Sequence, residues 1–144
     1  MAIMKIEPNV VDSTADFSFG NVTVSTIQTA SGTKIDGILE KNYNIPGAVK
    51  TSTGTTRWWA PTNLSVASVI CSVSTVPTGS ALNLAIKKNG TTIETTSILA
   101  DTATSSKDVS LSILAGDYIT IDITQVGSTV PGADLVVTFL YFRN

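Results

Sequence analysis

Histidine is absent from the 144-residue sequence, and this narrows the chemistry that the chain could perform. Without an imidazole there is no serine or cysteine triad of the usual kind and no general base that titrates near neutral pH. Most transition-metal sites in proteins also use histidine. Acid–base catalysis would have to depend on carboxylates alone. We therefore expect a protein that is not an enzyme and that has no catalytic residues, cofactor or metal ion.

The carboxylates do not form an obvious pair or cluster. Asp117 and Asp122 are five residues apart in one predicted strand, so they project from opposite faces, with Asp122 on the solvent side. Asp101, Asp108 and Asp134 are not concentrated in one loop, whereas a calcium site gathers several oxygens in one short segment. Neither pattern predicts a catalytic or calcium-binding site.

The single cysteine, Cys71, has no partner in the chain for a disulfide. Serine, valine and isoleucine residues flank it in a predicted strand, where a free thiol behaves as a small hydrophobic side chain. We expect Cys71 to be buried and unreactive.

The sequence Arg57-Trp58-Trp59 is the most suggestive local cluster. Adjacent residues of a strand face opposite ways, so one tryptophan enters the core and the other emerges, and the sequence does not say which. The emergent ring is either an anchor between subunits or a platform on which a sugar stacks. We favour the anchor, because tryptophan is enriched in interface hot spots, and assign both tryptophans to an oligomer or partner interface. Arg57 and Trp58 are the candidate glycan contacts of the alternative.

Composition favours sheets and excludes some partners. Only 14% of residues are charged, against about a quarter in a typical soluble domain, and serine and threonine take their place. The net charge is −2 and the basic residues are scattered, which argues against nucleic-acid binding. No stretch approaches the roughly 20 apolar residues that span a bilayer, so no membrane partner is expected. The first residues do not resemble a secretory signal, which predicts synthesis in the cytoplasm without signal-dependent secretion.

From residue 51 onward, short strands alternate with turn signals. The strongest signal is Asn89-Gly90, which suits a two-residue type I′ hairpin turn. The pattern predicts an all-β fold, an antiparallel β-sandwich of the jelly-roll type, over residues 51–144. The predicted strands are Thr55–Ala60, Asn63–Thr75, Ala81–Lys87, Thr92–Leu99, Val109–Ile113, Tyr118–Gln125 and Asp134–Phe142.

Residues 1–50 differ from the rest. Phe17 and Phe19 lie in a short strand-like stretch, and turn-rich sequence follows. Such a segment has too little apolar surface for a core of its own. We expect an N-terminal arm or extra hairpin that contacts the sandwich or a neighbouring molecule, with Phe17 and Phe19 in that interface.

The last predicted strand is apolar on both faces. One face carries Leu135, Val137, Phe139 and Tyr141, and the other carries Val136, Thr138, Leu140 and Phe142. Because one face can line the sandwich core, the second needs a cover of its own. We therefore place Val136, Leu140 and Phe142 in an interface with another copy of the chain.

The predicted strand 63–75 also has apolar residues on both faces. A regular strand would place Leu64, Val66 and Ile70 on one side and Ala67, Val69, Cys71 and Val73 on the other. Two such strands exceed what one small core can bury, and each exposed aliphatic side chain forgoes about 1.5–3 kcal/mol. Oligomerisation would remove this exposure.

Three segments resemble the β-sandwich modules of tailed-bacteriophage virion proteins, namely small head proteins and tail-fibre tips. They are residues 57–65 (RWWAPTNLS), 77–90 (PTGSALNLAIKKNG) and 115–139 (AGDYITIDITQVGSTVPGADLVVTF). The resemblance implies a non-enzymatic virion component, made in the host cytoplasm and commonly a homotrimer. It carries no catalytic motif.

The resemblance leaves two functions open. The chain lacks a repetitive shaft, which favours a capsid cement or decoration protein whose arm contacts the major capsid protein. The alternative is a receptor-binding tail or head fibre module that recognises host surface glycans. A cellular carbohydrate-binding module is a third function, and it would require secretion.

Overall fold

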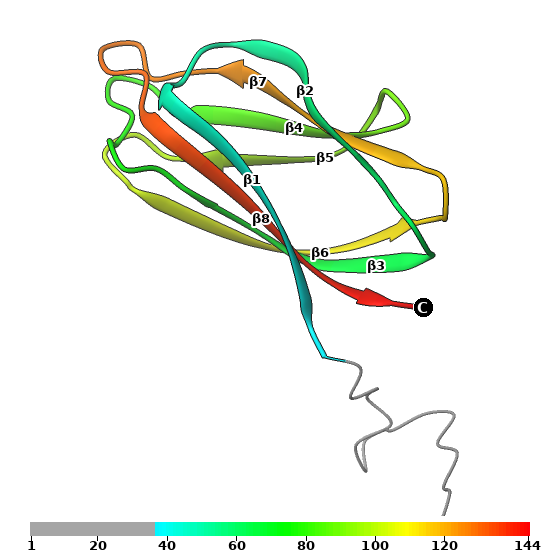
Figure 1. The fold of residues 1–144 in the computed structure, drawn as a ribbon. Coiled ribbons are helices and arrows are strands. Elements are labelled where there is room, and N and C mark those ends of the chain that lie inside the picture. The colour runs from blue at the N-terminus through cyan, green and yellow to red at the C-terminus, as the bar shows by residue number, and fades with distance from the viewer. Residues whose placement is uncertain (1–36) are drawn as a thin grey trace, which may run out of the picture. The chain divides into compact units, whose positions relative to one another are not determined.

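The computed structural model describes residues 37–144, whose regular structure is all β. Two antiparallel four-stranded sheets, of order β1-β8-β3-β6 and β2-β7-β4-β5, pack as a sandwich (Figure 1). The predicted antiparallel β-sandwich is therefore confirmed. No helix in this part of the chain is long and apolar enough to cross a membrane. The strands are β1 (Leu39–Ala48), β2 (Ser52–Trp59), β3 (Leu64–Ser72), β4 (Leu82–Lys88), β5 (Thr91–Ile98), β6 (Thr104–Ile113), β7 (Tyr118–Gln125) and β8 (Ala133–Arg143).

The strand pairs nest inside one another. β4 pairs with β5, and outside this hairpin β3 pairs with β6, β2 with β7 and β1 with β8. The arrangement is that of one long hairpin folded over on itself into two sheets. Its innermost turn is Asn89-Gly90, with φ of 52° and 85°, as a type I′ turn requires.

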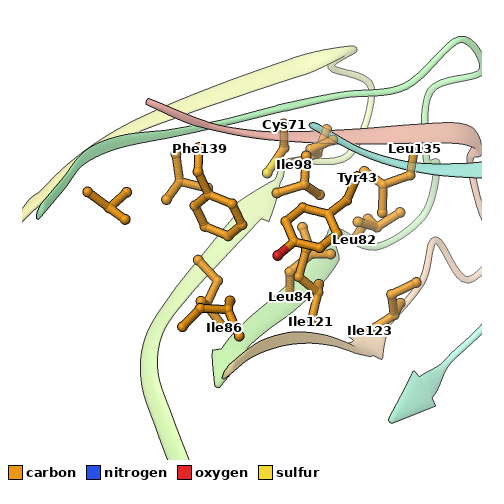
Figure 2. Packing of buried hydrophobic residues seen from close by; sticks show 14 of the residues in the cluster. Tyr43, Cys71, Leu82, Leu84, Ile86, Ile98, Ile121, Ile123, Leu135 and Phe139 are labelled. Carbon is orange, nitrogen blue, oxygen red and sulfur yellow. The ribbon is translucent and has the colours of Figure 1, made fainter. Parts of the chain in front are cut away.

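The core lies between the sheets and receives side chains from all eight strands or their ends. β7 directs Ile119, Ile121 and Ile123 into the core, each at most 2% exposed, but Thr120 and Asp122 between them are buried as well, so its second face is not wet as expected. Figure 2 labels two of these isoleucines, Ile121 and Ile123, which face Leu135 and Phe139 of β8 across the core.

β1 was expected in the N-terminal arm, but it is a strand of the sandwich. It pairs with β8 from Leu39 opposite Tyr141 to Ile45 opposite Leu135. Tyr43 is 4% exposed and stacks edge to face on Phe139, with ring centroids 5.4 Å apart. The sandwich therefore starts before residue 51, within a compact unit that spans residues 36–144.

A β-bulge changes the faces of β3. Its register with both β6 and β8 shifts between Val66 and Ser68, so Val66 and Val69 both point inward and are at most 1% exposed. Ile70 then faces outward, together with serines. The prediction that this strand is apolar on both faces is wrong, because it assumed an uninterrupted alternation.

β8 does have two apolar faces. Leu135, Val137 and Phe139 are at most 1% exposed, and on the opposite face Val136 and Leu140 are half-buried. Phe142 lies on this outer face as well and is also half-buried. One double-faced strand remains of the two that were expected.

Candidate functional site

Two bulges make β2 irregular. The register with β7 pairs Ser52 with Ile123, Thr55 with Ile121 and Trp58 with Ile119. Between successive pairs β2 advances by three residues and β7 by two, so β2 contains one extra residue in each of the two intervals. Gly54 and Thr56 have φ of 68° and 49° within these bulges. A positive φ is rare for a β-branched residue and tends to be found where a site re-aims its side chains.

The burial of the two tryptophans shows which of them faces outward. Trp58 is half-buried against the core, with its ring centroid 5.5 Å from that of Tyr141. Trp59 is 55% exposed and lies 5.1 Å from the ring of Tyr118. Trp58 is thus a packing residue. Trp59, rather than Trp58, is the candidate for a glycan contact or an exposed anchor.

Arg57 completes an aromatic and cationic cluster on the outer face of the second sheet. Its guanidinium carbon lies 4.4 Å from the centroid of the Tyr118 ring, the distance of a cation–π contact. Tyr118 therefore touches both Arg57 and Trp59. We call Arg57, Trp59 and Tyr118 the platform.

The innermost turn holds the platform in place. The backbone N–H of Tyr118 donates to Asn89 Oδ1 at 2.9 Å, and the backbone N–H of Asn89 donates to the Tyr118 carbonyl at 2.9 Å. Asn89 Nδ2 also donates to Asp117 Oδ1 at 2.6 Å. The platform thus rests on a rigid hairpin rather than on a free loop.

Asp117 has a structural partner for each oxygen. The backbone N–H of Leu114 donates to Oδ2 at 2.9 Å. This bond and the one from the Asn89 side-chain amide hold the pKa of the Asp117 carboxyl below its usual range. Lys88 lies 3.9 Å away. Asp117 thus stabilises the turn between β6 and β7.

Asp122 is not on a wet face, as its sequence position suggested, but is only 5% exposed. Its carboxylate accepts a hydrogen bond from the Gly54 backbone N–H at 2.7 Å and pairs with Lys87 Nζ at 2.5 Å. Burial by itself would raise the pKa of Asp122, but the bonds from Lys87 and Gly54 outweigh it and the pKa is lowered. Asp122 thus anchors the first bulge of β2.

The remaining candidate carboxylates, Asp134 and Asp108, do not form a metal-binding cluster. Asp134 accepts bonds from Ser74 Oγ at 2.6 Å and the Gly47 backbone N–H at 2.7 Å. Asp108 lies in β6, not in a loop. Over residues 37–144, no group of three potential metal-ligating side chains occurs.

Cys71 is fully buried, as expected, and burial raises the pKa of its thiol to about 11. The thiolate is therefore scarce at neutral pH. Phe17 and Phe19, which were expected in an interface, lie outside the described residues.

Tyr118 is the platform residue that the sequence did not single out. The available signal was its place on the polar side of β7, next to buried Ile119, where an aromatic residue stands out. Its contact with Arg57 and Trp59 depends on the bulges of β2, which the sequence pattern does not reveal.

The chain was compared with known proteins. No protein-family model and no curated protein matches it. Among solved structures, the fold is similar to that of a family 35 carbohydrate binding module from Clostridium thermocellum, with 14% identity over 73% of this chain and 92% of that chain, and a TM-score of 0.41. At this identity and TM-score the likeness extends to the β-sandwich fold and no further.

Proposed function

We propose that this chain is a non-catalytic recognition module that binds glycans through the platform of Arg57, Trp59 and Tyr118. The observation that carries the proposal is an exposed tryptophan stacked beside a tyrosine and an arginine on a sheet face. We also infer from the nested strand pairs that the sandwich is a jelly roll.

An exposed indole ring suits the C–H face of a pyranose. Removing the surface of a large aromatic side chain from water is favourable, and Trp59 is 55% exposed, so much of its indole surface is available for contact with a sugar. The N–H groups of Arg57 and the hydroxyl of Tyr118 can then donate to sugar oxygens.

The carboxylates beside the platform support a role without catalysis. Asp117 and Asp122 each accept hydrogen bonds from neighbouring groups and have a lysine nearby, and their pKa values are lowered rather than raised. A general acid near neutral pH would need a raised pKa. Neither carboxylate therefore suits that role.

Together with the resemblance to phage virion modules, the platform favours the receptor-binding function that the sequence left as the alternative. The chain would then be a virion component that recognises host surface glycans.

The test is glycan binding by the whole chain with and without the indole. We expect wild-type protein to bind members of an array of bacterial surface oligosaccharides, and Trp59→Ala to lose binding at least tenfold while its unfolding midpoint stays the same. Leu99→Ala is the matched control, because Leu99 is also an exposed apolar residue, at 65%, away from the platform. Equal binding by wild type and Trp59→Ala would overturn the proposal.

A second function, capsid decoration, is favoured by the outer face of β8. Val136, Leu140 and Phe142 are half-buried there, and Leu140 lies opposite Glu40 on β1 and Ser68 on β3. In this proposal the apolar side chains pack against another copy in a homotrimer or against the major capsid protein. Permanent interfaces of this kind bury about 2,000 Å² or more.

Two measurements test the second function. The number of copies per particle, from a stained gel of purified virions, should be in the hundreds for a decoration protein and a few dozen or fewer for a fibre component. Light scattering should show an oligomer that Leu140→Glu dissociates, whereas Thr92→Glu, at an exposed position on β5 in the other sheet, leaves it intact. A monomeric wild-type chain at high concentration would exclude the homotrimer.

A further inference from the structure

The basic residues beside the platform are unequally paired. Lys87 and Lys88 lie opposite Thr120 and Ile119 of β7, close to Tyr118. Lys87 pairs with Asp122 at 2.5 Å, and Lys88 lies 3.9 Å from Asp117. Arg57 has no carboxylate within salt-bridge distance among residues 37–144. Counting residues 37–144 alone, the platform therefore carries one positive charge without a neighbouring carboxylate.

The stacking of Arg57 leaves its hydrogen-bonding edge available. A guanidinium that lies over an aromatic ring uses its flat face, and its N–H groups point outward in the plane. Such an edge matches the two oxygens of a carboxylate, and the stacking reduces the conformational entropy lost on binding. The guanidinium carbon and the Trp59 ring lie 4.4 and 5.1 Å from the same Tyr118 ring, so one sugar and its substituent can touch both.

We propose that the platform selects acidic glycans, with a sugar ring stacked on Trp59 and the sugar carboxylate paired with Arg57. The inference rests on the proposed glycan function and narrows it to one chemical class, sugars that carry a carboxylate, such as uronic acids. Neutral sugars would keep the stacking contact and lose the ion pair.

The experiment uses pairs of probes that differ in the carboxylate alone. Oligogalacturonate and its methyl ester, and oligoglucuronate and its methyl ester, are titrated into the full chain by calorimetry at low and high salt. We expect at least one free acid to bind about tenfold more tightly than its ester, and the difference to shrink at high salt. Arg57→Gln should remove the preference, because it weakens binding of the acid more than binding of the ester.

Two variants complete the design. Lys50→Gln removes an exposed positive charge that is not part of the platform and should leave the preference intact. Trp59→Ala should weaken acid and ester alike, because both use the stacking contact.

The outcomes separate the two proposals. If acid and ester bind equally and Trp59→Ala weakens both, glycan binding stands and acid selection is wrong. If Arg57→Gln weakens acid and ester to the same extent, Arg57 does not read the carboxylate and acid selection is again wrong. If none of these probes binds, acid selection fails for uronic acids, and the array experiment alone decides whether other glycans bind.

Discussion

Tyr43 places a phenol hydroxyl inside an apolar core. Figure 2 shows its oxygen pointing into the space between the two sheets. The hydroxyl has no hydrogen-bond partner among the described residues, and burial raises the pKa of the phenol well above its ordinary value. An unpaired buried hydroxyl costs about 1–3 kcal/mol, which the burial of the ring against Phe139 offsets.

Replacing Tyr43 with phenylalanine should therefore increase stability. We expect Tyr43→Phe to raise the free energy of unfolding by about 1 kcal/mol, because it removes the unpaired hydroxyl and keeps the ring. Urea denaturation followed by tryptophan fluorescence measures the change. Tyr43→Ala should lower the free energy of unfolding by about 3–5 kcal/mol, because it leaves a cavity. A clear loss of stability in Tyr43→Phe would mean that the hydroxyl is paired in solution.

Asp122 is a buried acid with a structural role. Asp122→Asn should lower the free energy of unfolding by about 1–3 kcal/mol at pH 7, because Lys87 then lacks its charged partner and the bond from the Gly54 backbone N–H weakens. The measurement is denaturant unfolding, with Asp108→Asn as the control, since Asp108 is exposed.

The effect of Asp122 should depend on pH. Its folded-state pKa lies below its unfolded value, so it contributes stability above the unfolded pKa of about 3.9 and loses it as pH falls through the folded pKa. The difference between wild type and Asp122→Asn should therefore be constant from pH 5 to 7 and shrink below about pH 4. A difference that stays constant to pH 2 would contradict the ion pair.

Two loops approach each other closely at Gly127. The backbone N–H of Thr78 donates to the Val130 carbonyl at 3.0 Å, and that of Thr129 donates to the Thr78 carbonyl at 3.0 Å. A Cβ on Gly127 would meet the Thr78 nitrogen at 2.8 Å and lie closer still to the Val130 oxygen. These are backbone atoms, so a side chain cannot be accommodated by a change of rotamer.

Gly127→Ala should consequently be costly. We expect it to lower the free energy of unfolding by about 1–3 kcal/mol, because the contact between the β3–β4 and β7–β8 loops must open. The matched control is Gly37→Ala, where nothing lies within 4 Å of the added Cβ and the change should stay within about 0.5 kcal/mol. Thermal unfolding of both variants distinguishes them, and equal midpoints would show that the loops yield easily.

The strands differ in how far their sequences determine them. β7 was predicted with the observed bounds, because its isoleucines alternate strictly with polar residues. The start of β6 was missed, since Thr104–Asp108 is polar and lies at a sheet edge, where sequence resembles a loop. β1 was missed because only Leu39, Tyr43 and Ile45 are apolar on its inner face and Pro46-Gly47 reads as a turn.

The β-bulges, which the sequence pattern does not reveal, limited the prediction of the site more than errors in locating the strands did. One extra residue reverses the faces of everything beyond it, so the bulge in β3 removed its expected second apolar face. Arg57 and Trp59 were found from residue type alone. The contact of Tyr118 with them was not, because it depends on where β2 gains its extra residues.

The two sheets of the molecule present different outer surfaces. The platform lies on the sheet that contains β2 and β7, and the apolar side of β8 lies on the other sheet. Because the sheets pack with their inner faces together, the two surfaces point away from each other. The proposed glycan binding on one side would therefore not compete with the proposed packing on the other.

β8 is essential to the whole sandwich. It lies between β1 and β3 and contributes Leu135, Val137 and Phe139 to the core, each at most 1% exposed. We expect deletion of residues 133–144 to abolish the cooperative unfolding transition seen by circular dichroism, because β1 loses its neighbour and the core loses three large side chains. A cooperative transition in the shortened chain would show that the second sheet is stable by itself.

The nesting of strand pairs has a consequence for synthesis of the chain. Asn42 on β1 and Thr138 on β8 are joined by a hydrogen bond of 2.6 Å although 96 residues separate them. On the ribosome, β1 leaves the exit tunnel long before β8, its one partner strand within residues 37–144, is translated. Because the contact between β1 and β8 can form only at the end of synthesis, we expect folding to be slow. Until then the unpaired edge of β1 is a site at which chains can aggregate.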